Sequence, residues 1–581
     1  MSSAAGVRPA RRRLCFFAAA LGLLAVPFAN AAPIAFVGAT VLDGTGAPPL
    51  PDATVVIDGD RIVAVGPAAA VAVPADATRL DVRGKWLLPG LIDSHMHFFQ
   101  SGGAFARPDV IDLRAIRPYA DEVAAVRAAI PATLARTLAS GITTVVDVGG
   151  PMWTFDGHDL AARTAAAPRV AVSGPLLTPY LPPEVAVADP PMIQIATPAR
   201  ARAEVRRLAA QRPDLIKIWF VRAGPDIAPQ MAWIGAVIDE AHAAGLRVAV
   251  HATDLRLARA AVDAGADVLV HGIDDVVADA PFVFQLQAQG VVYTPTFAVV
   301  EGYARALGLT FRPTAMENRT GDPAAIESLL QLRQLPVRPR GVFPAPVPPI
   351  DPESAANLRR LRDAGVRIAA GSDAGNIGTL HGPGLHREME LMVQAGLTPM
   401  EAIVAATRNG ALLLRNDDIG VIVAGKVADL LLLDADPARR HPQHHANLAR
   451  RARRGGVRPR RPDRDGALIA AEFDPRLVEH PVAGRIGVGP RHRHHGHRIE
   501  VAAATRARRQ IARHFAAAVV GDDEIALADD VDFARHGAGA GVFAVDAEAD
   551  DAVAAAVHRL IGLVVEGEQN HLRAGVVAVE R

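Results

Sequence analysis

The sequence predicts an α/β fold, a TIM-type (β/α)8 barrel with a small flanking β domain, and two observations favour this class, with which the chain length is compatible. From Pro89 to about residue 412, apolar strand-like runs alternate with helical stretches rich in Ala and Arg, as in βαβ units. Eight such runs can be counted, which is the number of strands in a TIM-type barrel. The length of 581 residues accommodates one barrel with insertions.

The eight predicted strands have short apolar cores and are followed by helical segments or loops. They are Leu91 to His97, Thr143 to Val148, Arg169 to Val172, Leu215 to Phe220, Arg247 to His251, Val268 to His271, Val291 to Thr294 and Arg367 to Ser372. Two of the intervening helical segments end at Gly245 and Gly265, and glycine is common at helix C-termini. The proline-rich stretch from Leu335 to Pro352 cannot be a helix interior. We expect it to pass over the mouth of the barrel.

The segments before the barrel have different characters. Residues 1–31 join a basic stretch, Arg8 to Arg13, to the apolar run Leu14 to Val26 and an A-x-A site ending at Ala31, the layout of a secretory signal. We therefore expect export to the periplasm or medium, by the Sec or the twin-arginine route, with no membrane insertion after cleavage. Residues 32–88 show short apolar runs between Gly, Pro and Asp, which indicates a small β unit.

Composition excludes two classes of interaction. The 62 basic residues balance 62 acidic ones, so the chain has no overall attraction to nucleic acid or anionic lipid. The only cysteine, Cys15, lies in the predicted signal, so the mature chain has no thiol chemistry. Residues 448–581 are rich in Arg, Pro and His and lose regular apolar periodicity. They are either a low-complexity extension or the product of a lost reading frame, in which case the histidines at 492–497 are accidental.

Polar residues that bind metals follow several of the predicted strands. His95 and His97 are two residues apart on a strand, so their side chains share a face. His251, His271 and Asp373 each stand at the end of a later strand. One histidine after a strand is usually structural, but five such groups at the C-terminal ends of one barrel predict a metal site.

A lysine interrupts the fourth strand, DLIKIWF. By strand alternation, Ile216 and Ile218 share one face and Lys217 the other. If the apolar face meets the helices, Lys217 points into the barrel toward the histidines. A buried ammonium beside a divalent ion is costly, so this lysine is expected to be neutral, paired or chemically altered.

These motifs together resemble the amidohydrolase superfamily over about Ile34 to Pro437. The DSHMH motif with His95 and His97, IKIW with Lys217, the strand-end residues His251 and His271, and GSDAG with Asp373 occur in the superfamily's order. The stretches after Asp373 look like the subgroup of imidazolonepropionase-like and Xaa-Pro dipeptidase-like hydrolases. The resemblance implies a barrel over residues 89–412 and a β-sandwich domain completed by residues 413–447.

The resemblance also implies a binuclear centre and a reaction. One metal would lie between His95, His97 and Asp373, the other between His251 and His271, with a hydroxide and carbamylated Lys217 bridging them. Zinc suits these ligands, although manganese or cobalt could bind. Metal-bound water, with a pKa of about 7, would attack a C–N bond while Asp373 moves the proton to the leaving amine.

Residues that contact the substrate are less defined by the sequence. Candidates lie in loops expected above the barrel: Arg222, His158, Tyr180 and His381. Arg222 could bind a substrate carboxylate in a bidentate manner, which would suit a dipeptidase, but a solvated loop arginine is an equal alternative. His386 and Glu388 begin a helical stretch and are expected to be structural.

Three other functions compete with a binuclear hydrolase acting on small peptides or N-acyl amino acids. A mononuclear deaminase or imidazolonepropionase-like hydrolase would generally do without Lys217. A nonenzymatic barrel binder would not need the complete ligand set. A nucleic-acid binder is disfavoured because the basic tail lacks interleaved aromatic residues. A homo-oligomer is compatible with the sequence.

Overall fold

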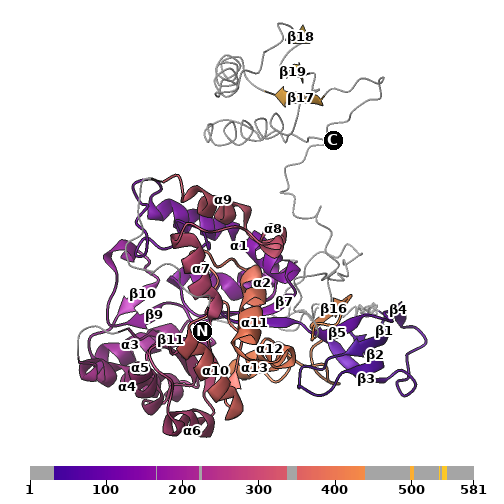
Figure 1. Ribbon diagram of the computed structural model, residues 1–581, viewed down its shortest axis with the longest axis horizontal. Coiled ribbons are helices and arrows are strands. Elements are labelled where there is room, and N and C mark those ends of the chain that lie inside the picture. Colours follow the sequence, from indigo (N-terminus) through magenta and orange to yellow (C-terminus); the bar gives the residue numbers. More distant parts are fainter. Residues whose placement is uncertain are drawn as a thin grey trace, which may run out of the picture. The chain divides into compact units, whose positions relative to one another are not determined.

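The computed structural model describes residues 32–164, 166–221, 226–335, 350–438, 497–502, 535–536 and 540–545. Its central element is a barrel of parallel strands (Figure 1), and every predicted strand region contains one. The eight barrel strands are β6 (Leu91–Met96), β7 (Ile142–Asp147), β8 (Arg169–Val172), β11 (Leu215–Trp219), β12 (Arg247–His251), β13 (Val268–Val270), β14 (Val292–Thr294) and β15 (Arg367–Ile368).

Two parallel sheets join to close this barrel. One is β6-β7-β8, and the other runs β10-β9-β11-β12-β13-β14-β15, where β9 (Leu176–Thr178) and β10 (Met192–Gln194) extend the sheet beyond β8. Asp214 N donates to Val172 O (2.9 Å) at one seam, and Ser94 N donates to Ala370 O (2.9 Å) at the other. The chain therefore forms a TIM-type barrel.

Helices follow the barrel strands, and several of them begin at side-chain caps. Thr197, Asp254 and Asp279 each accept a backbone N–H at the start of a helix, which satisfies a donor that the helix leaves free. The helices are α1 (Tyr119–Ala139), α2 (Gly157–Arg163), α3 (Pro198–Ala209), α4 (Ala228–Ala243), α5 (Leu255–Asp263), α6 (Ala280–Gln289), α7 (Phe297–Leu307), α8 (Ala315–Thr320), α9 (Pro323–Gln331), α10 (Pro352–Asp363), α11 (Pro383–Ala395), α12 (Pro399–Ala405) and α13 (Arg408–Leu413), with 3-10 turns η1 (Met152–Asp156) and η2 (Pro183–Val185).

The connection after β14 builds a second apolar cluster beside the barrel. Helices α7 to α9 occupy its first part, whereas residues 336–349 of the predicted proline-rich excursion lie outside the described residues. Phe311 and Leu329 from this connection pack with Ile111 and Leu113 from the loop after β6. Ile377 and Leu380, which follow the eighth strand, complete the same cluster. Three βα connections are thus held together by burial of apolar surface.

A small β domain flanks the barrel and is built from both ends of this unit. Its sheet has the order β16-β5-β1-β2-β3, with β4 paired to β1. The strands are β1 (Ile34–Val41), β2 (Leu50–Asp58), β3 (Arg61–Pro67), β4 (Thr78–Asp81), β5 (Trp86–Pro89) and β16 (Leu430–Leu433). Figure 1 shows the orange β16 beside the indigo strands, and Leu431 of β16 pairs with Leu88 of β5 in antiparallel fashion.

Residues 474–581 form a second unit of the chain. Its described strands, β17 (His497–Ala502), β18 (Arg535–His536) and β19 (Ala540–Val545), make an antiparallel sheet. Whether residues 448–581 are a low-complexity extension or the product of a lost reading frame stays a prediction. In HRIEVA, apolar Ile499, Val501 and polar residues alternate, a strand pattern too short to stand out in a basic region. The rest of the predicted tail (448–581), the last residues of the predicted small β domain (439–447) and the predicted signal (1–31) lie outside the described residues.

Candidate metal centre

The predicted metal-binding side chains converge at one end of the barrel. His95 lies in β6 and His97 just beyond it, His251 ends β12, and His271 and Asp373 follow β13 and β15. All of these positions are at the carboxyl ends of parallel strands, which meet at one face of a barrel.

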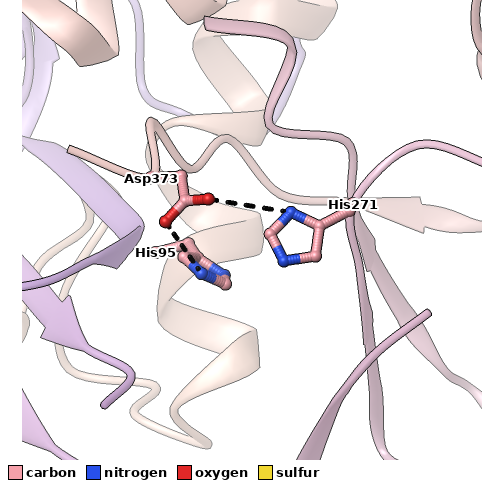
Figure 2. Close-up of side chains that lie close together, drawn as sticks. All are labelled: His95, His271 and Asp373. Atoms are coloured by element: carbon pink, nitrogen blue, oxygen red, sulfur yellow. Dashed lines mark ion pairs between the residues drawn. The ribbon is translucent and has the colours of Figure 1, made fainter. Parts of the chain in front are cut away.

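Asp373 stands at the middle of the cluster. Its Oδ1 lies 3.1 Å from His97 Nε2 and 3.4 Å from His95 Nε2. Its other oxygen, Oδ2, faces His271 Nδ1 at 3.8 Å. Figure 2 shows the carboxylate between the rings of His95 and His271, and ligand atoms of these three residues lie within 4.8 Å of one another. Such a set of two imidazoles and one carboxylate can hold a divalent ion.

The imidazole rings continue in a row away from Asp373. Ring centroids are 5.3 Å apart for His95 and His97, 5.0 Å for His95 and His271, and 4.3 Å for His271 and His251. The tightest set, with His95, His271 and Asp373, combines residues that were predicted to bind two different ions. The geometry thus groups all five residues without dividing them into two sites.

Lys217 lies beside this row, inside the barrel. Its side chain is 1% exposed, and Ile216 and Ile218 of the same strand pack in the main hydrophobic core. The amine Nζ has no hydrogen-bond partner among the described residues. Burial lowers the pKa of Lys217 to about 7, although the charge of Asp373 opposes this. A substantial share of this amine is therefore neutral near pH 7.

Backbone and hydroxyl groups orient two of the histidines. His97 Nδ1 donates to the carbonyl of Gly149 (2.9 Å), which leaves the lone pair on Nε2, toward Asp373. His271 Nδ1 lies 2.7 Å from Thr296 Oγ1. In contrast, neither ring nitrogen of His95 has a hydrogen-bond partner in the part of the chain that the structure describes. A buried imidazole with both nitrogens unsatisfied is costly without a further ligand.

The electrostatics of the cluster fit a divalent metal. Burial lowers the pKa of His95 and His251 to about 3, and the neighbouring Lys217 adds to this effect. Burial alone would raise the pKa of Asp373, but His95 and His97 hold it well below its usual value. Neutral imidazoles and an ionised carboxylate are the forms that coordinate a cation. Together with the unsatisfied nitrogens of His95, they show that the residues present suit a metal ion.

Backbone strain is present at the cluster. His271, Thr296 and Asp373 have positive φ angles of 78°, 52° and 54°, a left-handed region that side chains with a Cβ rarely adopt. Each such residue costs on the order of 1–3 kcal/mol. Strain of this kind persists where the surrounding structure holds a side chain in a required direction.

Two of the predicted substrate contacts have other partners. His158, in α2, pairs with Asp214 (2.8 Å), which immediately precedes β11 and so lies at the opposite end of that strand from the cluster. His381 is buried, and its Nε2 donates to the carbonyl of His97 (2.9 Å) while its ring stacks on Phe98. His381 therefore supports the end of the first barrel strand.

Of the remaining predicted side chains, one is exposed, one lies outside the described residues and two have structural contacts. Tyr180 follows β9 and is 49% exposed, so its ring is free to meet a substrate. Arg222 lies outside the described residues. His386 and Glu388 are buried in α11 and bond backbone groups, Ser140 O and Ala298 N respectively, which agrees with their expected structural role.

Sequence reasoning missed the groups that support the ligands. Asp93 accepts Ser372 Oγ (2.5 Å) and Ser372 N (2.9 Å), which ties the first strand to the eighth. Its place two residues before His95 in DSHMH, on the same strand face, was an available signal. Asn376, by contrast, donates to Asp373 from a loop with no periodic pattern.

The barrel and its cluster define a class of metal-dependent hydrolases, and comparison with known proteins names the family. Residues 86–458 match the Amidohydrolase family, so the chain belongs to it and is a hydrolase of carbon–nitrogen bonds. The imidazolonepropionase of Streptomyces coelicolor is 29% identical over 401 residues, which span 66% of this chain and 86% of the relative.

Two crystal structures extend the comparison. A Bifidobacterium longum protein assigned as a prolidase is 26% identical, with a TM-score of 0.52, covering 72% of this chain and 93% of its own. A prolidase complexed with N-methylphosphonate-L-proline is 25% identical, with a TM-score of 0.53, covering 70% of this chain and 94% of its own.

No helix in the described ranges is long and apolar enough to cross a membrane.

Proposed function

We propose that the protein is a binuclear amidohydrolase that cleaves the amide bond of a dipeptide or an N-acyl amino acid, with carbamylated Lys217 joining two metal ions. The observation that carries the proposal is the amine of Lys217, which is 1% exposed, faces the histidines and has no hydrogen-bond partner among the described residues. A fixed positive charge there would oppose cation binding.

Carbamylation would resolve this conflict. The neutral amine nitrogen bonds to the carbon of carbon dioxide and releases one proton, so a cation is replaced by an anion with two oxygen ligands. The chain has three lysines, and the other two, Lys85 and Lys426, have side chains that are 40% and 31% exposed. Lys217 is therefore the one lysine of the three whose surroundings favour a permanent change of charge.

The binuclear proposal assigns these ligands to two ions. His95, His97 and Asp373 Oδ1 would hold one ion, and His251 with His271 would hold the other. Zinc suits this mixture of nitrogen and oxygen ligands, with manganese or cobalt as alternatives. When bound, such ions lower the pKa of water to about 7 and polarise a carbonyl group.

Asp373 is the residue of this chain that is placed to move a proton. Its Oδ1 is turned to His95, His97 and Asn376, whereas among the described residues Oδ2 has only the longer contact of 3.8 Å with His271. Oδ2 would accept the proton of the attacking water and deliver it to the leaving amine nitrogen. The exposed ring of Tyr180 and the side chain of Arg222 are proposed to contact the substrate.

The similarity to the prolidase structures supports a dipeptide substrate, since one of them holds a phosphonate attached to proline. The alternative is a mononuclear hydrolase of a cyclic amide. It is favoured by the tight set of His95, His271 and Asp373 and by the imidazolonepropionase relatives. The two proposals differ in the number of ions that Lys217 helps to hold.

Metal analysis of the purified protein tests the choice. About two ions per chain in the native protein, falling to about one or none in Lys217→Ala, would support the binuclear form, with Lys85→Ala as the matched control. Omission of bicarbonate during reconstitution should lower the native count in the same way. A count that Lys217→Ala leaves unchanged would refute a bridging role. Turnover of dipeptides, N-acyl amino acids and lactams or imidazolones then assigns the substrate class.

We also propose that the chain is exported and loses residues 1–31. The basic, apolar and A-x-A segments of this region support the proposal. Mass spectrometry of the protein from a native host should find a mature N-terminus at or near residue 32, and an intact N-terminus in the cytoplasm would contradict it.

A further inference from the structure

Asp373 is held by an amide from the loop that follows it. Asn376 Nδ2 donates to Asp373 Oδ1 (2.8 Å) and to the backbone carbonyl of Asp373 (3.2 Å). Asn376 is 3% exposed and Asp373 is 5% exposed, so water competes little for these bonds. One carboxylate oxygen is thereby assigned to a protein donor.

Two other groups determine which way this amide points. Arg107 Nη1 and the hydroxyl of Tyr303 each donate to Asn376 Oδ1 at 2.7 Å. Because guanidinium N–H groups can only donate, the atom that they meet must be the oxygen of the amide. The NH2 group is then the one left to face Asp373, so the orientation follows from the bonding partners.

Arg107 is itself fixed by a carboxylate. Its Nε lies 2.8 Å from Asp109 Oδ1 and its Nη2 lies 2.5 Å from Asp109 Oδ2, the bidentate arrangement that orients a guanidinium most strongly. Arg107 Nη1 also donates to the Tyr303 hydroxyl at 3.1 Å. A continuous chain of polar contacts thus runs from Asp109 through Arg107 and Asn376 to Asp373.

The chain of contacts is mounted on three adjacent βα connections. Arg107 follows the first barrel strand, Tyr303 lies in α7 after the seventh, and Asn376 follows the eighth. Gly102 N donates to Gly375 O (2.8 Å), and Gly378 N donates to Gly102 O (2.9 Å). A Cβ at Gly378 would lie 2.2 Å from the carbonyl oxygen of Gly302 in α7, so these backbones are in direct contact. Small displacements of Asn376 are therefore resisted on all sides.

We propose that Asn376, oriented by Arg107 and Tyr303, is a positioning residue that occupies Oδ1 of Asp373 and leaves Oδ2 as the proton-carrying oxygen. The proposal deepens the function proposed above and depends on it for the role of Oδ2. Asn376 does not meet substrate in this arrangement; it acts through Asp373. Tyr303 and Arg107 act one step further away, through the amide.

The isosteric variant Asn376→Asp tests the proposal most sharply. It replaces the donor by a carboxylate that can still accept from Arg107 and Tyr303, so the loop keeps its anchor while Asp373 loses its donor. Loss of a bond to a charged group predicts a kcat that falls about 10- to 100-fold, with KM within about threefold. Tyr303→Phe, which leaves Arg107 in place, should lower kcat by only about threefold. Asn318→Asp, on the exposed side of α8, is the matched control and should keep native values.

Unfolding of the metal-free protein separates this proposal from the proposed function. In the cycle of Asn376→Asp and Asp373→Asn, the double variant restores an amide facing a carboxylate. It should melt at a higher temperature than the sum of the two single shifts predicts. Additive shifts would overturn the proposal whether or not a substrate is found, as would native kcat in Asn376→Asp. If the native enzyme turns over no amide tested, the proposed function fails, while the cycle still decides whether Asn376 holds Asp373.

Discussion

The two sides of the metal centre differ in how far the protein alone satisfies them. On the side of the first and eighth strands, Asp373 is bonded to Asn376 and faces His95 and His97, and Asp93 links the two strands. On the side of the fourth strand, the amine of Lys217 is buried and has no hydrogen-bond partner among the described residues.

The carboxylate of Asp373 is therefore held in place by other protein groups, whereas the amine of Lys217 has no such partner among the described residues. Burial of an amine without a hydrogen-bond partner lowers the stability of a fold. In this protein the cost arises at Lys217, among the histidines of the barrel. Protein groups alone hold the carboxylate of Asp373 in place, whereas in the proposed binuclear centre the burial of Lys217 would become favourable only when carbon dioxide and metal are added. The predictions below test each side, beginning with the largest expected effect.

Removal of the charge of Asp373 should abolish most of the activity. Asp373→Asn keeps the size of the side chain but removes the proton acceptor and one anionic ligand. We expect kcat to fall by roughly 10³-fold or more on any amide that the native enzyme cleaves. Asp418→Asn, at an exposed position, is the control. Retention of a tenth of native kcat in Asp373→Asn would rule out its role in proton transfer.

The buried ion pair of Arg107 and Asp109, which orients Asn376, should contribute far more to stability than an exposed ion pair. Asp109→Asn leaves the guanidinium of Arg107 buried without its carboxylate, and the expected loss in the free energy of unfolding is about 3 kcal/mol. Asp418→Asn breaks the exposed contact with Arg61 (2.9 Å) and should cost less than about 1 kcal/mol. Denaturant titrations measure both, and equal losses would show that the Arg107 pair is no more than a surface ion pair.

Glu388 lies behind Asp373 and should make stability depend on pH. Burial raises the pKa of Glu388 to about 8, well above that of a glutamate in the unfolded chain, so the folded state holds more protons between these two pKa values. Stability should therefore fall as pH rises from about 5 to 8. Glu388→Gln removes the titration and should therefore be more stable than the native protein at pH 8, with a much smaller difference at pH 5. If the free energies of unfolding of the native protein and of Glu388→Gln differ by the same amount at pH 5 and at pH 8, this prediction is wrong.

Replacement of Thr296 should have a smaller effect, on metal binding by His271. Its hydroxyl lies 2.7 Å from His271 Nδ1, and groups that orient a ligand in this way contribute to metal affinity. Thr296→Val should weaken zinc binding about tenfold in a chelator competition. Thr296→Ser keeps the hydroxyl and should restore most of the affinity. If the Ser and Val variants bind zinc equally, the hydroxyl has no orienting role.

The barrel and its cluster could be predicted because strands impose simple patterns. The two-residue alternation of a strand predicted that Lys217 points away from the face of Ile216 and Ile218. The histidines and Asp373 were identified because they stand at the carboxyl ends of predicted strands. Strand limits were less accurate, since β15 ends at Ile368, although Ala369 N still donates to Tyr293 O.

The supporting residues could not be predicted, because their contacts depend on tertiary packing. Arg107, Tyr303 and Asn376 come from three loops or helices far apart in the sequence, and only the packing of α7 on the glycine-rich loop brings them together. His158 was placed above the barrel because it follows the second strand, but α2 carries it to Asp214 instead. Loop direction leaves no periodic signal.

The state of Lys217 is the central claim, and NMR with 13C-labelled bicarbonate tests it most directly. The metal-loaded native protein and Lys85→Ala should each show one carbamate carbon signal, and Lys217→Ala should show none. A native protein with full metal content but no carbamate signal would contradict the account, as would a signal that survives in Lys217→Ala.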